Sequence, residues 1–342
     1  MKVAKYFNQK DIRYEEAPVP KVGSKEGLVK MKACGICGSD LMDWYLKDRA
    51  PLVLGHEPSG VLIKVGGGVE NFERGDRVFV HHHVPCLTCQ YCIRGAYTMC
   101  EQFKKTYIDP GGFSEYFRIP APNLQIDTLK LPDSISFEEA TLIEPTACCI
   151  RALKKCKVRL GDTIVVVGAG SSGIIHTMLL RILGVGRIIV SEPIGYRRNI
   201  AKKLGADVVI NTEKENFYER VMDETYGRGG DVVIVTAPSI HAIASGFEAC
   251  SQGGTLCIFA PTAPKECLEL NPNKLFFSEI TVVSSYSASH LETRAALKLI
   301  EAQRIEAEEL ITHRFPLSKT GEAFKTAIED KESLKIIITG EK

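Results

Sequence analysis

The segment Thr163-Ile-Val-Val-Val-Gly-Ala-Gly-Ser-Ser-Gly173 decides the fold of the second half of this chain. Its strand-forming residues run directly into a glycine-rich turn, and the apolar stretch 174–183 that follows predicts a helix ending at Gly184. A strand, a G-x-G-x-x-G turn and a helix in this order let a pyrophosphate approach the amide groups at the start of the helix. We therefore expect a dinucleotide site at Gly168, Gly170, Ser172 and Gly173, with a simple tight turn as the alternative.

The acidic residue that a dinucleotide site requires is Glu192, at the end of the next apolar strand. It lies about twenty residues after the turn, where a carboxylate can accept hydrogen bonds from the adenosine ribose hydroxyls, which favours NAD over NADP. A solvated charge at a strand end is the alternative. Arg197 and Arg198 keep NADP open, because a guanidinium there can bind a 2′-phosphate.

Three stretches of the chain follow different patterns. Residues up to about 119 show short alternating strands cut by turns, which predicts a small β-rich domain. From about residue 161, strands that are apolar on both faces alternate with helical patterns, which is typical of a parallel sheet covered by helices. These strands are expected at 163–167, 187–191, 207–210, 232–235 and 255–260. The last fifty residues predict a helix near 291–302 and a final strand at 334–339.

Four cysteines form a closely spaced set with the pattern Cys86-x2-Cys89-x2-Cys92-x7-Cys100. Four thiolates this close together can form a tetrahedral cage around one Zn²⁺, which leaves no position for water and makes the site structural. Disulfides are the alternative, but nothing else in the chain resembles a secreted protein.

A second set of candidate ligands is more widely spaced. It consists of Cys37 in Cys37-Gly-Ser-Asp40, His56 and Glu57 in Gly55-His-Glu-Pro58, and Glu144 in Ile143-Glu-Pro145. Sulfur, nitrogen and oxygen ligands from distant segments can leave zinc a position for substrate, which indicates a catalytic site. The alternative is a core thiol beside an ordinary histidine. We exclude the tract His81-His82-His83, because three consecutive side chains on a strand alternate between faces.

Composition limits the classes of function. The chain has 342 residues, of which 44% are hydrophobic, and this is long enough for two cores. A net charge of +1 with mixed signs predicts no nucleic-acid or anionic-lipid partner, and no apolar run reaches the length of a membrane span. Twelve cysteines, several of them in apolar stretches, suit a reducing compartment. We expect a soluble cytoplasmic protein that acts on small molecules.

Taken in order, these motifs resemble those of a known family. Cys37-Gly-Ser-Asp40, Gly55-His-Glu57, Gly75-Asp-Arg-Val78, the cysteine set, Glu144-Pro145 and the glycine-rich turn extend over nearly the whole chain. The chain is similar to the zinc-dependent medium-chain dehydrogenase/reductase family, also called the alcohol dehydrogenase superfamily. Its sorbitol and polyol dehydrogenase branch is the most similar, with threonine dehydrogenases nearby, because Glu144 stands where simple alcohol dehydrogenases have cysteine.

The resemblance implies an α/β fold with two domains. A GroES-like β-rich catalytic domain would contain residues 1–148 and 290–342. A Rossmann domain with a doubly wound parallel sheet would bind the nucleotide with residues 149–289, and the active site would lie in the cleft between them. Cys37 and His56, with Glu57 or Glu144, would bind a catalytic zinc, and the four-cysteine set would bind a structural zinc. Ser39 would contact the substrate hydroxyl, and the chain would form a homodimer or homotetramer.

The resemblance also implies the reaction, which is the reversible zinc- and NAD-dependent oxidation of a secondary alcohol to a ketone by hydride transfer. A small polyol or diol is the expected substrate. A threonine-type 3-hydroxy amino acid dehydrogenase, a general secondary-alcohol dehydrogenase and an idle zinc- and nucleotide-binding protein are the alternatives. Two positions depart from the family pattern: Met42 replaces a relay histidine, and Ser285 precedes Tyr286 where polyol dehydrogenases tend to have arginine.

Overall fold

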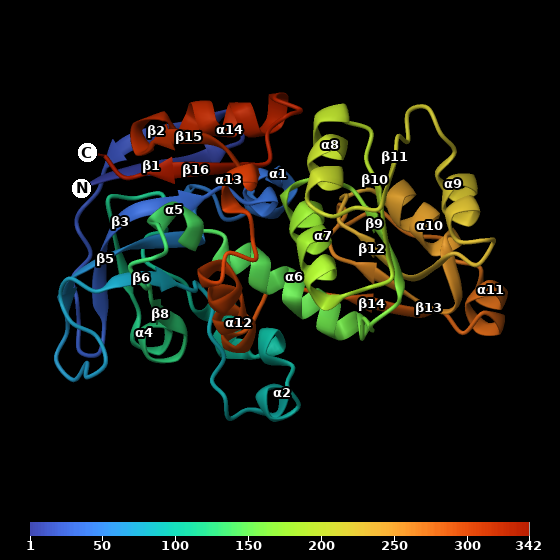
Figure 1. The fold of residues 1–342 in the computed structure, drawn as a ribbon. Coiled ribbons are helices and arrows are strands. Elements are labelled where there is room, and N and C mark those ends of the chain that lie inside the picture. The colour runs from blue at the N-terminus through green and yellow to red at the C-terminus, as the bar shows by residue number, and fades with distance from the viewer. Residues whose placement is uncertain (342) are drawn as a thin grey trace. The chain divides into compact units, whose positions relative to one another are not determined.

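The computed structural model describes residues 1–341 and divides the chain into two compact units (Figure 1). The first unit contains Met1–Ala147 and the chain from Ala288 onward, and the second contains Cys148–Ser287. Helix α6 (Ile143–Cys156) spans the boundary between them. The first unit therefore has to be completed by a segment that is more than a hundred residues away in the sequence.

The second unit is built on one six-stranded sheet in the order β11-β10-β9-β12-β13-β14, with every pairing parallel. This order is that of doubly wound dinucleotide-binding folds, so the predicted Rossmann sheet is confirmed. The strands are β9 (Thr163–Val167), β10 (Arg187–Ser191), β11 (Val208–Ile210), β12 (Gly230–Val235), β13 (Cys250–Ile258) and β14 (Thr281–Ser284). The helices are α7 (Ser171–Leu183), α8 (Gly195–Lys203), α9 (Phe217–Glu224), α10 (Ile240–Glu248) and α11 (Pro272–Phe277).

The apolar strands of this sheet are buried on both faces because helices cover them. Val165 and Val166 of β9 are fully buried, although neighbouring strand side chains point to opposite faces. Helices α7 and α8 contact strands β9 to β11, while α10 contacts β12 and β13. The register aligns Val167 of β9 with Ser191 of β10 and with Val235 of β12. The carboxyl ends of the three central strands therefore meet at one edge, beside the glycine-rich turn.

The first unit is built on a seven-stranded sheet and a smaller three-stranded one. The large sheet has the order β15-β16-β3-β5-β6-β8, with β7 also paired to β3, and the small sheet has the order β2-β1-β4. The strands are β1 (Lys2–Asn8), β2 (Asp11–Glu16), β3 (Gly27–Gly35), β4 (Leu52–Val53), β5 (Glu57–Val65), β6 (Arg77–Val80), β7 (Tyr116–Ile119), β8 (Thr128–Lys130), β15 (Ile311–Pro316) and β16 (Lys335–Thr339).

Short helices connect these strands. They are η1 (Gly38–Leu41), α1 (Asp43–Leu46), α2 (Gln90–Ile93), η2 (Tyr97–Met99), α3 (Glu101–Lys105), α4 (Ala121–Asp127), α5 (Phe137–Ala140), α12 (His290–Glu301), α13 (Ala307–Leu310), η3 (Leu317–Lys319) and α14 (Thr320–Glu329). No helix within residues 1–341 is both long and apolar enough to cross a membrane.

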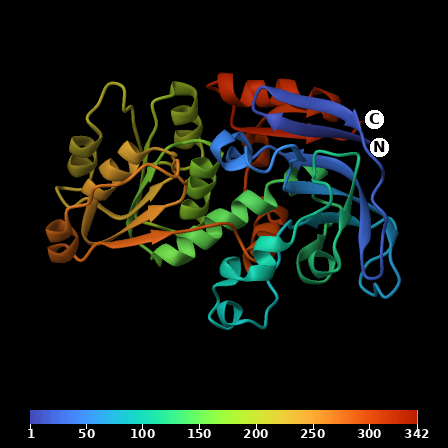
Figure 2. The same cartoon turned by 180° about the vertical axis from the view of Figure 1, so that it is seen from behind.

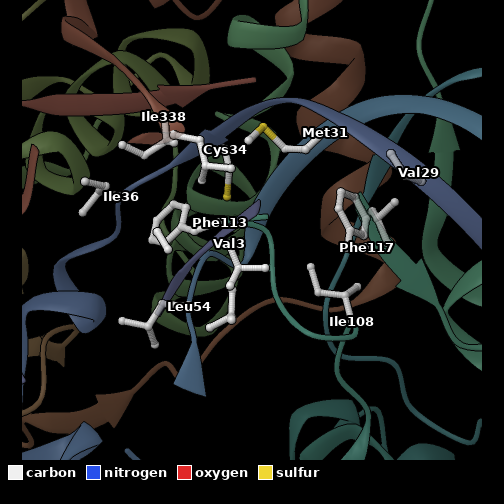
Figure 3. Packing of buried hydrophobic residues seen from close by; sticks show 14 of the residues in the cluster. Val3, Val29, Met31, Cys34, Ile36, Leu54, Ile108, Phe113, Phe117 and Ile338 are labelled. Carbon is white, nitrogen blue, oxygen red and sulfur yellow. The ribbon is translucent and has the colours of Figure 1, made fainter. Parts of the chain in front are cut away.

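The core of the first unit lies between its two sheets (Figure 3). Cys34 and Met31 of β3 pack there with Phe113 and Ile338, and all four side chains are buried. Strand β3 ends at Gly35, two residues before Cys37, and β16 pairs with β3 in antiparallel register, Ile338 opposite Cys34. The core therefore fixes the segment that carries the first candidate zinc ligand.

The C-terminal segment returns to the N-terminal strands. Figures 1 and 2 both show α14 and β16 beside β1 and β2, and α14 contacts β2. In both views the loop that carries α2, with the four clustered cysteines, extends away from the sheets. Strand β16 begins at Lys335, and this position brings a charged side chain next to the end of β3.

Candidate active site

Three of the predicted zinc ligands lie together in the first unit. Cys37 is the N-cap residue of η1, and His56 and Glu57 stand where the chain enters β5. One ligand atom from each, a sulfur, an imidazole nitrogen and a carboxylate oxygen, lies within 4.8 Å of the others. These three donor types suit a zinc ion with a fourth position left open, so the residues present fit the metal.

Asp40 orients two of these residues. One of its carboxylate oxygens lies 3.4 Å from His56 Nδ1, and the other accepts a 3.0 Å hydrogen bond from the amide of Cys37. Burial lowers the pKa of His56, but the charges of Asp40 and Cys37 outweigh burial and hold that pKa well above its usual value. Because Nδ1 faces Asp40, Nε2 is the nitrogen that remains for a metal, as in many zinc sites.

Glu57 forms a buried ion pair. Lys335 Nζ lies 2.8 Å from Glu57 Oε2 and also donates a 3.1 Å hydrogen bond to the carbonyl of Ile36. Burial works against the charged form of Lys335, yet Glu57 holds the pKa of that amine above its usual value, so the ammonium stays charged. A Cβ at Gly35 would lie 1.9 Å from Glu57 Oε2, so glycine is the residue that leaves room for the carboxylate.

Glu144 lies in a second group of potential ligands. It begins α6 and is 5% exposed, and its carboxylate is within 4.8 Å of ligand nitrogens of His81 and His82. Glu144 also acts electrostatically on Glu57 and Lys335, raising the pKa of both. Two buried carboxylates, Glu57 and Glu144, therefore both act electrostatically on Lys335.

The histidine tract His81 to His83 directly follows strand β6. Strand β6 ends at Val80, and His81 and His82, but not His83, group with Glu144 as possible ligands, so the three histidines do not share one site. The His82 ring lies 4.9 Å from the His56 ring, while His83 Nδ1 pairs with the carbonyl of Thr106. Burial lowers the pKa of His82 well below its usual value and that of His83 to about 3, so both rings are neutral near pH 7.

Ser39 lies two residues after Cys37, in η1, and is half-buried. Its backbone carbonyl accepts the amide of Met42, which ends η1. The aromatic residues that follow pack on each other, since Trp44 and Tyr45 have ring centroids 5.9 Å apart and the Arg49 guanidinium lies 4.4 Å above the Tyr45 ring.

The four clustered cysteines form a separate group whose sulfur atoms all lie within 4.8 Å of one another. The Sγ atoms of Cys92 and Cys89 are 3.6 Å apart, and those of Cys86 and Cys92 are 4.0 Å apart. A tetrahedral zinc with sulfur at about 2.3 Å would space its ligands by about 3.8 Å, whereas a disulfide needs about 2.05 Å. Hydrogen bonds from Thr88 and from the amide of Cys89 lower the pKa of Cys86 to about 6. This group fits a structural zinc.

The glycine-rich turn lies in the second unit between β9 and α7. Gly168 has φ +101°, and Gly170 is the N-cap residue of α7. A Cβ at Gly173 would lie 2.0 Å from the carbonyl oxygen of Gly168, so glycine is required for this close contact. The carbonyl of Ser172 accepts a 2.8 Å hydrogen bond from buried His176, whose pKa burial lowers to about 4. The amides at the start of α7 remain oriented toward an anion.

Glu192 stands at the end of β10 and is 4% exposed. It is therefore not a solvated surface charge. Its two carboxylate oxygens accept hydrogen bonds from the amides of Ala169, at 2.8 Å, and Ile194, at 3.0 Å. A carboxylate has about four acceptor positions, so Glu192 can still accept from a hydroxyl. Arg198 donates a 2.8 Å hydrogen bond to the carbonyl of Glu192. Arg197 precedes Arg198 in α8.

Three residues of the metal region were not predicted from the sequence. Asp40 stands in the Cys37 motif without a predicted role of its own, and neither Lys335 nor His82 was expected in the site. Lysine at the start of the apolar strand Lys-Ile-Ile-Ile-Thr was the signal for Lys335, because a charge in such a strand needs a partner. No sequence signal pairs Lys335 with Glu57, which lies 278 residues away.

The comparisons with known proteins identify the family. Residues 23–133 match the Alcohol dehydrogenase GroES-like domain, and residues 172–302 match Zinc-binding dehydrogenase. Sorbitol dehydrogenase of Bacillus subtilis (strain 168) is 32% identical over 99% of this chain and 97% of its own length. L-threonine 3-dehydrogenase of Pyrococcus furiosus is 34% identical over 91% of this chain and 90% of its own. The crystal structure of 2R,3R-butanediol dehydrogenase from Bacillus subtilis superposes with a TM-score of 0.87 at 29% identity, over 99% of each chain.

The chain belongs to the zinc-dependent medium-chain dehydrogenase/reductase family, the zinc-dependent alcohol and polyol dehydrogenases. It is an oxidoreductase, and the predicted pairing of a GroES-like β-rich domain with a Rossmann domain is confirmed.

Proposed function

We propose that the chain catalyses the zinc- and NAD-dependent, reversible oxidation of a secondary hydroxyl on a small polyol or vicinal diol. The observation that carries this proposal is the convergence of Cys37, His56 and Glu57, with a second buried carboxylate, Glu144, acting on the same lysine. Zinc bound by these residues would supply Lewis acidity toward the substrate oxygen. A structural zinc at the four cysteines would bring the number of sulfur-bound ions to two per chain.

The residues around the proposed metal site have different roles. Asp40 holds His56 Nδ1 and would leave Nε2 free to bind the ion, and Lys335 balances the charge of Glu57. We assign to Ser39 the contact with the reacting hydroxyl and the first step of proton removal. Met42 cannot continue this transfer, because a thioether has no exchangeable proton.

A polyol or diol is favoured over a simple alcohol by the oxygen-rich surroundings. Glu144 provides a carboxylate that can accept a hydrogen bond from a second hydroxyl, which a thiolate would do poorly. A site built to bind that second hydroxyl discriminates strongly against an analogue that lacks it.

NAD is the proposed cofactor, bound by Gly168, Gly170, Ser172, Gly173 and Glu192. The amides at the start of α7 would hold the pyrophosphate, and Glu192 would accept the ribose hydroxyls. The carboxylate of Glu192 would repel a 2′-phosphate, so NADP is the less favoured cofactor. Arg197 is the residue we would expect to contact the cofactor if NADP were used.

We further propose a cytoplasmic homo-oligomer, a dimer or tetramer. Strand β14 is an edge of the six-stranded sheet and is mostly exposed, and such an edge can pair with a second copy. Phe276 and Phe277, at the end of helix α11 before this strand, are 74% and 79% exposed. Twelve free cysteines suit a reducing compartment.

The experiment that tests the proposed reaction measures NADH formation with a panel of polyols, vicinal diols, simple secondary alcohols and 3-hydroxy amino acids. Cys37→Ser provides the background, because it removes one proposed catalytic ligand. Turnover of a polyol or diol above this background supports the proposal. L-threonine is the second candidate substrate, because the similarity to an L-threonine 3-dehydrogenase is as high as that to a sorbitol dehydrogenase.

A further inference from the structure

A buried histidine of the second unit supports the glycine-rich turn. His176 lies in the second turn of α7 and is completely buried. Its Nδ1 makes a 2.8 Å hydrogen bond to the carbonyl of Ser172. A carbonyl oxygen can only accept, so Nδ1 carries the ring hydrogen. Burial lowers the pKa of His176 to about 4, so the ring is neutral near pH 7 and Nε2 is an acceptor.

The second nitrogen of this ring shows what the histidine contributes. Nε2 of His176 is buried and has no hydrogen-bond partner among residues 1–341. The ring packs edge-on against Phe259, which follows β13, with centroids 4.8 Å apart. A buried polar atom without a partner costs free energy, and an apolar side chain of similar size would avoid that cost. The contribution of the histidine is therefore the bond from Nδ1 to Ser172.

The carbonyl of Ser172 accepts from further donors. The thiol of Cys149, in α6, donates to the same oxygen at 3.7 Å. The helix adds the backbone amide of His176, since each helical amide donates to the carbonyl four residues before it. Donors from α6 and α7 therefore meet at one carbonyl oxygen.

This carbonyl belongs to the same peptide group as the amide of Gly173. Gly173 is the third residue of α7, and the first amides of a helix have no partner within it. Hydrogen bonds to a carbonyl polarise its peptide group and strengthen the amide of that group as a donor, by about 10–30% per bond. The donors to Ser172 thus strengthen the amide of Gly173 at the end of the helix that attracts anions.

We propose that His176 is a positioning residue for the cofactor, which fixes and polarises the Ser172–Gly173 peptide so that the Gly173 amide binds the pyrophosphate. The role rests on the proposed binding of a dinucleotide at the glycine-rich turn. It holds for NAD and NADP alike, because both carry the pyrophosphate. No contact between His176 and the cofactor is needed.

Ligand binding to the full chain tests this role. The dissociation constant of NADH is measured by its fluorescence. Displacement of NADH gives those of ADP-ribose, which has the pyrophosphate, and adenosine, which lacks it. His176→Leu should weaken NADH and ADP-ribose by about two- to tenfold, the range expected for one hydrogen bond. Adenosine should bind with unchanged affinity, whereas general damage to the site would weaken all three ligands.

Thr177→Val is the matched control. Thr177 is also completely buried, and its hydroxyl donates a 2.9 Å hydrogen bond to the carbonyl of Gly173. The amide of that peptide belongs to Ile174 and already donates to Gly170 at 3.0 Å, so this variant should bind all three ligands normally. His176→Asn keeps a donor near the place of Nδ1 and should recover most of the affinity for ADP-ribose. Thermal melting shows whether each variant is folded.

Three results would overturn the proposal. One is equal affinity of His176→Leu and the unmodified chain for ADP-ribose, and another is an equal loss for adenosine and ADP-ribose. The third is a loss in His176→Asn as large as that in His176→Leu. If neither NADH nor ADP-ribose binds the unmodified chain, the proposed cofactor site fails and this role fails with it. None of these measurements needs zinc or turnover, so the polyol assignment can fail while this role stands.

Discussion

Lys335 Nζ lies 2.9 Å from Oε1 and 2.8 Å from Oε2 of Glu57, and the side chains are 3% and 0% exposed. The lysine comes from the C-terminal strand β16 and the glutamate from the start of β5. Pairing of β16 with β3 places the ammonium beside the carboxylate. The C-terminal segment thus completes the charge balance of the candidate metal site.

Replacing Lys335 by methionine should be strongly destabilising. The change leaves the Glu57 carboxylate buried without its partner, and loss of one member of a buried pair costs about 3–5 kcal/mol. Urea denaturation measures this change in the free energy of unfolding. Lys335→Arg keeps the charge and serves as the control. A loss below about 1 kcal/mol for methionine would show that the pair is not needed to compensate Glu57.

The two sulfur-containing groups should respond differently to substitution. Cys89→Ser breaks the four-sulfur cage, so we expect loss of one zinc ion and a lower melting temperature. Cys37→Ser should keep the cage zinc and the folded structure but lose turnover. Metal analysis together with thermal melting distinguishes the two variants. Fewer than two zinc ions in the freshly purified, unmodified protein would contradict this assignment.

Stability should fall in acid because His176 is buried and neutral. Burial lowers its pKa from 6.5 to about 4. Below pH 6.5 the unfolded chain therefore binds a proton that the folded chain does not, and stability decreases until the pH reaches about 4. The loss of unfolding free energy caused by His176 is about 3 kcal/mol at most.

Comparison of variants isolates the contribution of His176. His176→Gln should show a shallower fall in unfolding free energy between pH 6.5 and 4. His241, exposed at the start of α10, provides the control, and His241→Gln should behave as the unmodified chain does. An unchanged slope in His176→Gln would mean that other groups cause the acid sensitivity.

Cofactor preference should depend on Glu192. We expect a higher kcat/KM for NAD than for NADP, because the carboxylate would repel the 2′-phosphate. Glu192→Gln removes the charge and should reduce this preference by about tenfold, which corresponds to about 1.4 kcal/mol. Steady-state kinetics with both cofactors provides the measurement. A preference for NADP in the unmodified chain would direct attention to Arg197 and Arg198.

Much of the second unit could be predicted because its signals are local. The turn at Gly168 to Gly173 requires glycines at fixed positions, and strands buried on both faces appear as continuous apolar runs such as β9. The four cysteines are similarly close in sequence. In each case the residues that form the feature lie within a few positions of one another.

The surroundings of the candidate metal site could not be predicted in the same way. The pairs Lys335 with Glu57 and Asp127 with His81 join segments that are 278 and 46 residues apart. Such contacts are set by sheet pairing, which a single sequence does not specify. The strand before the histidine tract ends at Val80, and such strand ends are the least certain part of a pattern.

The substrate is the most direct test of the proposed function. The measurement is kcat/KM for (2R,3R)-butanediol and for 2-butanol at saturating NAD, which differ by one hydroxyl. We predict that the diol is preferred, by up to about 10⁴ if the second hydroxyl is fully hydrogen-bonded. An equal or higher kcat/KM for 2-butanol would contradict the polyol assignment and indicate a general secondary-alcohol dehydrogenase.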